Sequence, residues 1–567
     1  MASWRDRAGT LFTPEKSPAA GSAGVVAANN PIGSAAGLEM LANGGNAFDA
    51  AIAALFALNV VEPQMVGLFG AGWINLRLAD GTAVVIDNYA TSPGEATPDM
   101  YKPVSDVWPD YMLAEGRRNK VGYLATGVPG ALKGWVEVVQ TYGRLGLEAV
   151  LQPAIRIAEQ GFHPSPYLIG MIERNAEDLA ARQATAEILL PNGVPPTEAD
   201  RIVQHDLSRT LRTIASEGAD VLYDGSLGQT IVDDIQKNGG LLTMEDLRQY
   251  RTVYREVLNG RYRGYDLAVP SPPCSGGLHL LQILNILEGY DVAELGFGTS
   301  ESVHLLAECF KIAFADRAAH VGDPAQMHIP VDWLISKPYA DQRRGDIDPA
   351  RAVDFAPGLA PSAESSSTTH VTVVDAEGNV AALTQTINEG FGAKVIVPGT
   401  GLFLNNNMAL FDPHPGQPNS VGPNRRMVSS NAPTIVSKDG CPSLALGTPG
   451  GVRIFTSVAQ AIVNVLDHGM TLQEAVEAPR VWTQGQNLEL ESAFPDSVSD
   501  SLASLGHPID RVRAVAGGMN GVQYDPENGW ITGACCWRAD GAPAALSGGR
   551  ARSGTTFNPT ADREDRG

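Results

Sequence analysis

Residues 367–388 read Ser-Thr-Thr-His-Val-Thr-Val-Val-Asp-Ala-Glu-Gly-Asn-Val-Ala-Ala-Leu-Thr-Gln-Thr-Ile-Asn, and this stretch carries the strongest structural signal in the chain. Residues rich in Val and Thr on both sides of an Asp-, Gly- and Asn-containing turn are typical of a β-hairpin. The predicted strands are 369–374 and 380–386. Antiparallel pairing around the turn would bring Thr386 and Asn388 beside Thr368.

Thr368 stands between a Ser-rich run, 357–367, and the first of these strands. A threonine at such a junction can become a nucleophile if the chain is cut before it. Its free α-amine, with a pKa of about 8, would then take the proton from its own Oγ. The alternative is a threonine that only begins a strand after a flexible linker, and the local sequence does not separate the two.

The composition limits the classes of protein to consider. The chain has 567 residues, of which 44% are apolar, and a formal net charge of −22. This predicts a large core, divided over two or three domains or held in one interleaved unit. The charge argues against nucleic acid or an anionic membrane as partner, because either needs a basic patch. The five cysteines show neither disulfide nor zinc spacing and are expected to be reduced thiols.

Targeting signals are not apparent in the sequence. Residues 1–16 are polar, and no segment reaches the roughly 18 consecutive apolar residues of a transmembrane helix. Neither a signal peptide nor a membrane span is therefore expected, and the predicted location is cytoplasmic.

The order of the expected elements indicates the fold class. A mixed region comes first, a mostly helical region over 150–306 follows, and strands return from 369. The tail from 552 is polar and expected to be disordered. This order favours a layered α+β architecture over strict βαβ alternation. Individual helices are predicted at 33–42, 47–59 (capped by Asn46 and apolar on nearly every side), 303–314 and 457–466, and early strands at 74–78 and 82–86.

Two glycine-rich stretches are candidates for anion binding. Residues 67–72 lack the strand-to-helix setting of a nucleotide loop, so a tightly packed turn is the favoured interpretation. Residues 447–453, Gly-Thr-Pro-Gly-Gly-Val-Arg, could present backbone N–H groups to an anion, with an ordinary turn as the alternative. The histidines, including His370 and His414, show no metal-ligand spacing, so structural roles are expected and no metal site is predicted.

Together with further short motifs, these stretches resemble the gamma-glutamyltranspeptidase family of N-terminal-nucleophile hydrolases. The resemblance runs from about residue 24 to residue 555. Each motif is weak alone, but their common order makes the resemblance specific. The matching pieces are 44–51, 127–130, 272–277, 313–317, 368–370, 375–379, 405–408, 429–430, 433–435 and 449–451.

The resemblance implies a four-layer αββα sandwich, made as one precursor that cuts itself into two subunits that stay together. Cleavage between Ser367 and Thr368 would give a large subunit, 1–367, and a small subunit, 368–567. Thr368 would then attack a small-molecule amide without a metal or organic cofactor. The positions that match the family's functional residues are Thr386 beside the nucleophile, Gly450 and Gly451 at the oxyanion, and Asn388, Asn407, Ser429 and Ser430 at the substrate.

Two positions depart from the pattern of the family's transpeptidases. Tyr89 stands where they carry the arginine that binds the glutamyl α-carboxylate, and Leu410 where they carry the aspartate that binds the α-ammonium. Losing both contacts should disfavour γ-glutamyl donors. The chain most resembles the cephalosporin acylase branch, which removes glutaryl-type side chains. The alternatives are a glutathione hydrolase acting on γ-glutamyl donors and a non-catalytic binding protein on the same fold.

Overall fold

The predicted hairpin lies at the centre of the fold. In the computed structural model, which describes residues 3–355 and 367–548, β7 (Thr369–Asp375) and β8 (Val380–Thr386) pair antiparallel. Every residue of both strands is buried. The Asp375 carboxylate accepts hydrogen bonds from the backbone N–H groups of Glu377 and Asn379 and so fixes the turn. The hairpin prediction is confirmed.

The hairpin belongs to the first of two stacked sheets. On one side β7 pairs with β1, and on the other side β8 pairs with β2. All of these pairings are antiparallel, and β16 adds to the far side of β1. The other strands of this sheet are β1 (Ala19–Ala28), β2 (Ala71–Arg77), β3 (Ala83–Asn88), β4 (Val253–Arg255) and β16 (Ala542–Gly548).

The second sheet packs face to face on the first, and β1 belongs to both. The beginning of β1 pairs with β15, and the rest of it pairs with β7. The Asn75 side chain crosses between the sheets and donates to the carbonyls of Ala268 and Pro433 at 2.9 and 3.0 Å. From β1 outward, the second sheet contains β15 (Trp530–Cys535), β14 (Asn520–Asp525), β10 (Cys441–Gly447), β9 (Thr434–Lys438), β6 (Tyr265–Pro270) and β5 (Val257–Tyr262).

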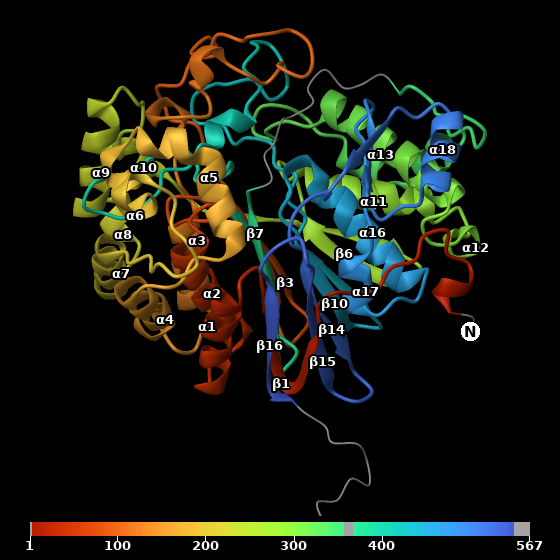
Figure 1. Ribbon diagram of the computed structural model, residues 1–567, viewed down its shortest axis with the longest axis horizontal. Helices are drawn as coiled ribbons and strands as arrows, with labels where there is room; N and C mark the ends of the chain where they lie inside the picture. Colours follow the sequence, from red (N-terminus) through yellow and green to blue (C-terminus); the bar gives the residue numbers. More distant parts are fainter. Residues whose placement is uncertain (1–2, 356–366, 549–567) are drawn as a thin grey trace, which may run out of the picture.

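Helices cover the outer face of each sheet (Figure 1). Each helical layer encloses a large apolar core against its own sheet, and a smaller apolar cluster lies between the sheets. The layer on the first sheet contains α1 (Pro31–Ala42), α2 (Ala47–Val61), α3 (Ala131–Tyr142), α4 (Leu147–Gln160), α5 (Pro166–Ala180), α6 (Gln183–Leu189), α7 (His205–Glu217), α8 (Asp220–Tyr223), α9 (Ser226–Lys237) and α10 (Met244–Gln249).

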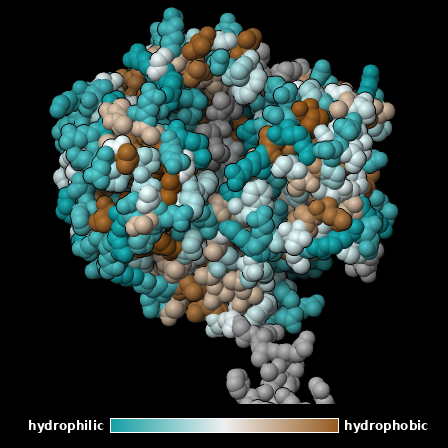
Figure 2. Space-filling view, in the orientation of Figure 1, coloured by the Kyte–Doolittle hydropathy of each residue, from teal (hydrophilic) through white to brown (hydrophobic). Residues whose placement is uncertain are grey.

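The helices on the second sheet complete four layers in the order helix, sheet, sheet, helix. This is the expected αββα sandwich of the α+β class. Apolar residues are only scattered over the face shown in Figure 2, which fits their burial in these cores. The second layer contains α11 (Ser275–Leu287), α12 (Val292–Leu295), α13 (Ser300–His320), α14 (Val331–Leu334), α15 (Lys337–Arg344), α16 (Ile454–Leu466), α17 (Leu472–Glu477) and α18 (Asp496–Ser504).

Helix α2 shows how local sequence and tertiary packing agree. Asn46 and Asp49 form a reciprocal capping box at its start, as the sequence predicts. All of its residues are buried, which explains an apolar character on every side. The N–H of Ala47 also donates to the Asp375 carboxylate at 2.9 Å, so the start of the helix is attached to the hairpin turn.

The prediction that 150–306 is mostly helical is confirmed, because helices α4 to α13 occupy most of it. The sequence analysis did not anticipate three strands within this region, β4, β5 and β6, over residues 253–270. β4 is the edge strand of the first sheet and pairs with β3, whereas β5 and β6 form a hairpin that joins the second sheet through β9. A small separate sheet holds β11 (Val481–Trp482), β12 (Leu488–Glu491) and β13 (Ile509–Val512).

The other predictions on the fold have mixed outcomes. All five cysteines are free, as expected. Among the described residues, no helix is both long and apolar enough to span a membrane. The tail from 552 and most of the Ser-rich run 357–367 lie outside the described residues.

Candidate active site

Thr368 and Thr386 meet at the open end of the hairpin. The Thr368 hydroxyl donates to Thr386 Oγ1 at 3.2 Å, and the Thr386 hydroxyl donates to the carbonyl oxygen of Ser367 at 2.7 Å. Thr386 Oγ1 also accepts from the backbone N–H of Asn388 at 2.7 Å. Thr368 is only 4% exposed. The arrangement places the Thr368 hydroxyl near a peptide carbonyl that already accepts a hydrogen bond from another hydroxyl.

The glycine-rich stretch 447–453 packs on the same strand. A Cβ on Gly447 would lie 2.4 Å from the His370 ring, so this position has room for glycine alone. Gly450 has φ 146°, and a Cβ there would lie 2.5 Å from the Ala516 side chain. Gly451 (φ 58°) opens a 3-10 turn, η6 (Gly451–Arg453). The first N–H groups of such a turn have no acceptor within it and are suited to binding an anion.

Asn407 combines deep burial with unmet hydrogen-bonding capacity. It begins the 3-10 turn η5 (Asn407–Leu410) and has no exposed surface. Neither its Oδ1 nor its Nδ2 has a hydrogen-bond partner among the described residues. Buried side-chain amides are nearly always paired, so an unpaired one is a signature of a ligand site.

Ser429 and Ser430 are held at the start of α11. The Ser429 carbonyl accepts from the backbone N–H of Ser275 at 2.7 Å. Arg317, on α13, donates to the hydroxyls of both Ser275 and Ser430, at 2.9 and 3.2 Å. The Asn388 side chain, by contrast, donates to the Asn406 carbonyl at 3.0 Å.

Tyr89 and Leu410, the two departures from the transpeptidase pattern, belong to one apolar cluster. Their exposed fractions are 2% and 3%. Trp73 and Met408 are in the same cluster, and the rings of Trp73 and Tyr89 are 6.3 Å apart. The two positions that depart from the transpeptidase pattern are therefore surrounded by aromatic and aliphatic side chains.

A cleft of about 700 Å³ opens beside Ser367. Its charged lining is mostly cationic, although the whole chain carries a net charge of −22. Arg174, on α5, is exposed, and its one recorded hydrogen bond among the described residues goes to the Met171 sulfur, a weak acceptor. Three of the cations, Arg117, Arg453 and Arg538, form ion pairs with Asp178, Glu489 and Glu491, so much of this positive charge is balanced. The charged lining residues are Arg117, Arg174, Lys394, Arg453, Arg538, Glu389 and Glu489.

Sequence reasoning missed one buried acid next to the site. Glu62 follows the last residue of α2, and its Oε2 accepts from the Thr369 hydroxyl at 3.0 Å. Its Oε1 has no partner among the described residues. Burial raises the pKa of Glu62 to about 8, so the side chain is mostly protonated at neutral pH. The sequence did contain a signal for this burial, because an acidic residue directly after an entirely apolar helix is expected to be buried.

The raised pKa of Glu62 predicts a pH-dependent stability. An unfolded glutamate ionises above about pH 4.3, whereas the folded protein retains the proton up to about pH 8. The unfolded state therefore binds fewer protons in this window, and stability falls as pH rises through it. Glu62→Gln removes this titration, so the variant should gain stability relative to wild type between pH 5 and pH 8. Urea unfolding at both pH values measures the difference.

The control for this comparison is Glu527→Gln, which makes the same change at an exposed position. Its stability difference from wild type should be the same at both pH values. A Glu62→Gln difference that does not change with pH would contradict the buried, protonated state.

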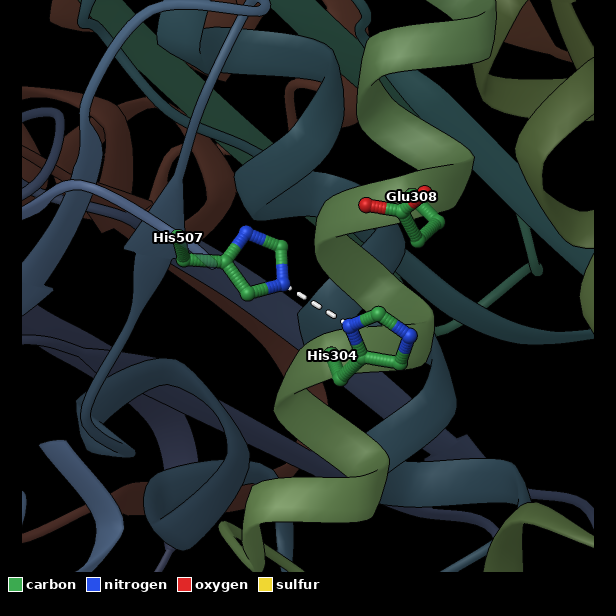
Figure 3. Close-up of side chains that lie close together, drawn as sticks. All are labelled: His304, Glu308 and His507. Carbon is green, nitrogen blue, oxygen red and sulfur yellow. Dashed lines mark hydrogen bonds between the residues drawn. The ribbon is translucent and has the colours of Figure 1, made fainter. Parts of the chain in front are cut away.

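A second buried polar cluster contains the side chains of His304, Glu308 and His507 (Figure 3). His304 Nδ1 is 2.8 Å from His507 Nε2, and Glu308 is one turn further along α13. Burial lowers the pKa of His507 to about 3, so its ring stays neutral. The positions of these ligand atoms could suit a metal ion. However, Glu308 already accepts from Lys311 Nζ at 2.6 Å, and that ammonium would repel a cation.

The remaining contacts of this cluster also favour a structural role. His304 Nε2 lies 2.9 Å from the Asp348 carbonyl oxygen, and the second Glu308 oxygen accepts from the Val353 N–H at 3.0 Å. The ligand atoms therefore have protein partners and form a hydrogen-bonded network. Sequence spacing could not identify the cluster, because His507 is 203 residues from His304.

Comparison with known proteins identifies the family. The family model described as Gamma-glutamyltranspeptidase matches residues 33–546. The chain is 53% identical to the acylase ACY 1 proenzyme of Pseudomonas sp. (strain SE83), over 96% of this chain and 98% of that protein. It is 36% identical to the glutathione hydrolase proenzyme of Escherichia coli (strain K12), over 89% and 88%.

A solved structure gives the same result. The cephalosporin acylase from Bacillus halodurans superposes with a TM-score of 0.85 at 30% sequence identity, covering 95% of this chain and 98% of that one. The model match, the identities and the superposition all extend over nearly the full length. The chain therefore belongs to the gamma-glutamyltranspeptidase family of N-terminal-nucleophile amide hydrolases.

Proposed function

We propose that the protein is a precursor that cuts itself between Ser367 and Thr368 and then hydrolyses amides through an acyl-enzyme on Thr368. The contact chain from Thr368 through Thr386 to the Ser367 carbonyl carries this proposal. Thr368 Oγ attacks the Ser367 carbonyl carbon, and the proton from Oγ goes to the departing Thr368 nitrogen. Water then hydrolyses the resulting ester. The products are a chain of residues 1–367 and a chain of residues 368–567 with a free Thr368 amine.

The same hydroxyl then acts on substrate. The Thr368 α-amine takes the Oγ proton as Oγ attacks the amide carbonyl, and it passes the proton to the leaving amine. The N–H groups of Gly450 and Gly451 bind the oxyanion. Water finally hydrolyses the acyl ester on Thr368. Every proton is transferred by groups of this chain or by water.

The substrate is proposed to be an amide with an acidic acyl group of the glutaryl type. The exposed Arg174 in the cleft beside Ser367 offers a cation to an acidic group. Tyr89 and Leu410 carry no charge that could pair with an α-ammonium group, so a γ-glutamyl donor gains no ion pair from these two positions. The identity to an acylase proenzyme supports this choice. Glutathione hydrolysis is the second candidate, because Asn407 retains unpaired polar atoms that could bind an amino acid.

Restoring the transpeptidase pair should shift the substrate preference. Wild type is expected to prefer a glutaryl p-nitroanilide over the γ-glutamyl analogue. The double variant Tyr89→Arg with Leu410→Asp should move the ratio of the two kcat/KM values toward γ-glutamyl by about tenfold or more, since about 1.4 kcal/mol is enough for tenfold. The measurement is kcat/KM for both anilides with both proteins.

The isosteric double variant Tyr89→Phe with Leu410→Met controls for general disturbance of the cluster and should leave the ratio near that of wild type. If wild type strongly prefers the γ-glutamyl anilide, glutathione hydrolysis replaces the acylase assignment. If processed wild type hydrolyses no amide, the remaining interpretation is a non-catalytic binding protein on the same fold.

A further inference from the structure

The strand registers define a row of residues that ends at the nucleophile. In the observed register Ala71 on β2 is opposite Thr386 on β8, and continuing the neighbouring registers by one residue places Tyr89 and Thr368 in the same row. Residues opposite one another in antiparallel strands share a face of the sheet. The row therefore gives the direction in which an acyl group on Thr368 would extend from β7 toward β2.

Trp73 stands beside this row, two residues along β2 from Ala71, and its side chain lies on the same face. It has no exposed surface and belongs to the apolar cluster with Tyr89 and Leu410. Its indole Nε1 has no hydrogen-bond partner among the described residues. Asn407, next to Met408 of the same cluster, has two further unpaired polar atoms. Trp73 is opposite Thr384, two residues along β8 from Thr386, so its unpaired indole N–H is available to a ligand of this face that supplies an acceptor.

The position of Trp73 matches the reach of a short diacid. Neighbouring strands are about 4.8 Å apart, so the far end of a glutaryl group on Thr368 lies one to two strands away, above β8 or β2. Asp87, opposite Trp73 on β3, would repel a carboxylate if it were free. It is instead neutralised by Arg255 and Arg426, which donate to its two oxygens at 2.8 Å.

We propose that the indole N–H of Trp73 donates to the carboxylate at the far end of the acyl group and thereby selects acidic acyl chains. This inference rests on the proposed function, because it assigns a specificity-determining residue to the same site. Asn407 Nδ2 is placed to share the carboxylate. In this proposal Trp73 binds the carboxylate through a neutral N–H donor, where an arginine at position 89 would bind it through a charged one.

Trp73→Phe tests the proposal, because phenylalanine keeps an aromatic ring and removes the N–H. The ratio of kcat/KM for glutaryl p-nitroanilide to that for butyryl p-nitroanilide should fall by about ten- to a hundredfold, mainly through KM, since hydrogen bonds to charged groups are the strong ones. The butyryl group has a similar chain without the carboxylate. Equal losses on both anilides, or no loss on the glutaryl one, would overturn the proposal.

Trp4→Phe is the matched control. Trp4 is also buried with an unpaired Nε1, but it packs on Phe12 and Phe297 in a separate cluster. The same substitution there should leave the glutaryl-to-butyryl ratio at the wild-type value. A ratio that falls equally in Trp4→Phe would assign the effect to general loosening of the fold.

A binding measurement separates this inference from the proposed function. In processed protein labelled with ¹⁵N-tryptophan, the Trp73 indole signal is identified by its absence from the Trp73→Phe spectrum. Added glutarate should move that signal downfield, and butyrate should not. This measurement does not depend on turnover. It therefore tests the hydrogen bond from Trp73 even if the enzyme prefers another acidic amide as substrate. An unmoved Trp73 signal at saturating glutarate would refute the hydrogen bond.

Discussion

Thr368→Ala should leave the chain uncut and abolish amide hydrolysis. The variant lacks the hydroxyl that contacts Thr386 and lies beside the Ser367 carbonyl, so neither the internal ester nor an acyl-enzyme can form. Intact-mass spectrometry should find one chain in the variant. In wild type it should find two, and the smaller one should begin Thr-Thr-His-Val. Anilide hydrolysis should fall by at least about 10³-fold, to the background of the assay.

Thr368→Ser is the control, because serine keeps a hydroxyl at the same place. It should still be cut at the same bond, more slowly or equally fast. Cleavage of Thr368→Ala between the same two residues would show that another protease or another residue performs maturation, and the precursor mechanism would fail.

Thr386→Val should slow self-cleavage by about 10²–10³-fold while the protein stays folded. Valine has nearly the shape of threonine but no hydroxyl, so the variant loses the donor to the Ser367 carbonyl and the acceptor for the Thr368 hydroxyl. The carbonyl is then less polarised, and the developing oxyanion lacks a partner. The measurement is the fraction of cut chain over time after purification at low temperature, followed by mass spectrometry.

Two variants test the specificity of that effect. Thr386→Ser restores a hydroxyl and should recover most of the cleavage rate. Thr434→Val makes the same isosteric change at another fully buried threonine, on β9 of the second sheet, and should be cut at the wild-type rate. Near-normal cleavage of a folded Thr386→Val would exclude the proposed role for this hydroxyl.

Much of the fold could be predicted because the signals are local. Alternating β-branched residues around an Asp-Ala-Glu-Gly-Asn turn specify the hairpin over 369–386, and its observed register brings Thr386 to Thr368 as expected. The capping box at Asn46 and Asp49 likewise depends on residues three apart. The strands in 253–270 escaped prediction, although β5 and β6 form a local hairpin. β4 and β6 also depend on β3 and β9, which are far along the chain.

For the candidate site, too, some residues can be predicted from the sequence and others only from the structure. Ordered motifs predict Thr368, Gly450, Gly451 and Asn407 as site residues, because chemistry restricts which residue types can stand at such positions. The partners of those residues were not predictable. Glu62 reaches Thr369 across 307 positions, and no pattern in a single sequence joins them.

Residue type and short-range spacing thus predict the hairpin and the capped helices of this protein, since each depends on interactions within a few residues, and they single out Thr368 as the candidate nucleophile. The pairing of β3, β2, β8 and β7 places Ala71 and Trp73 opposite Thr386 and Thr384, and it also creates the buried, unpaired donors of the candidate site. Such features arise only when strands distant in sequence pack together and exclude water, because burial turns an ordinary indole or amide into a group that requires a partner.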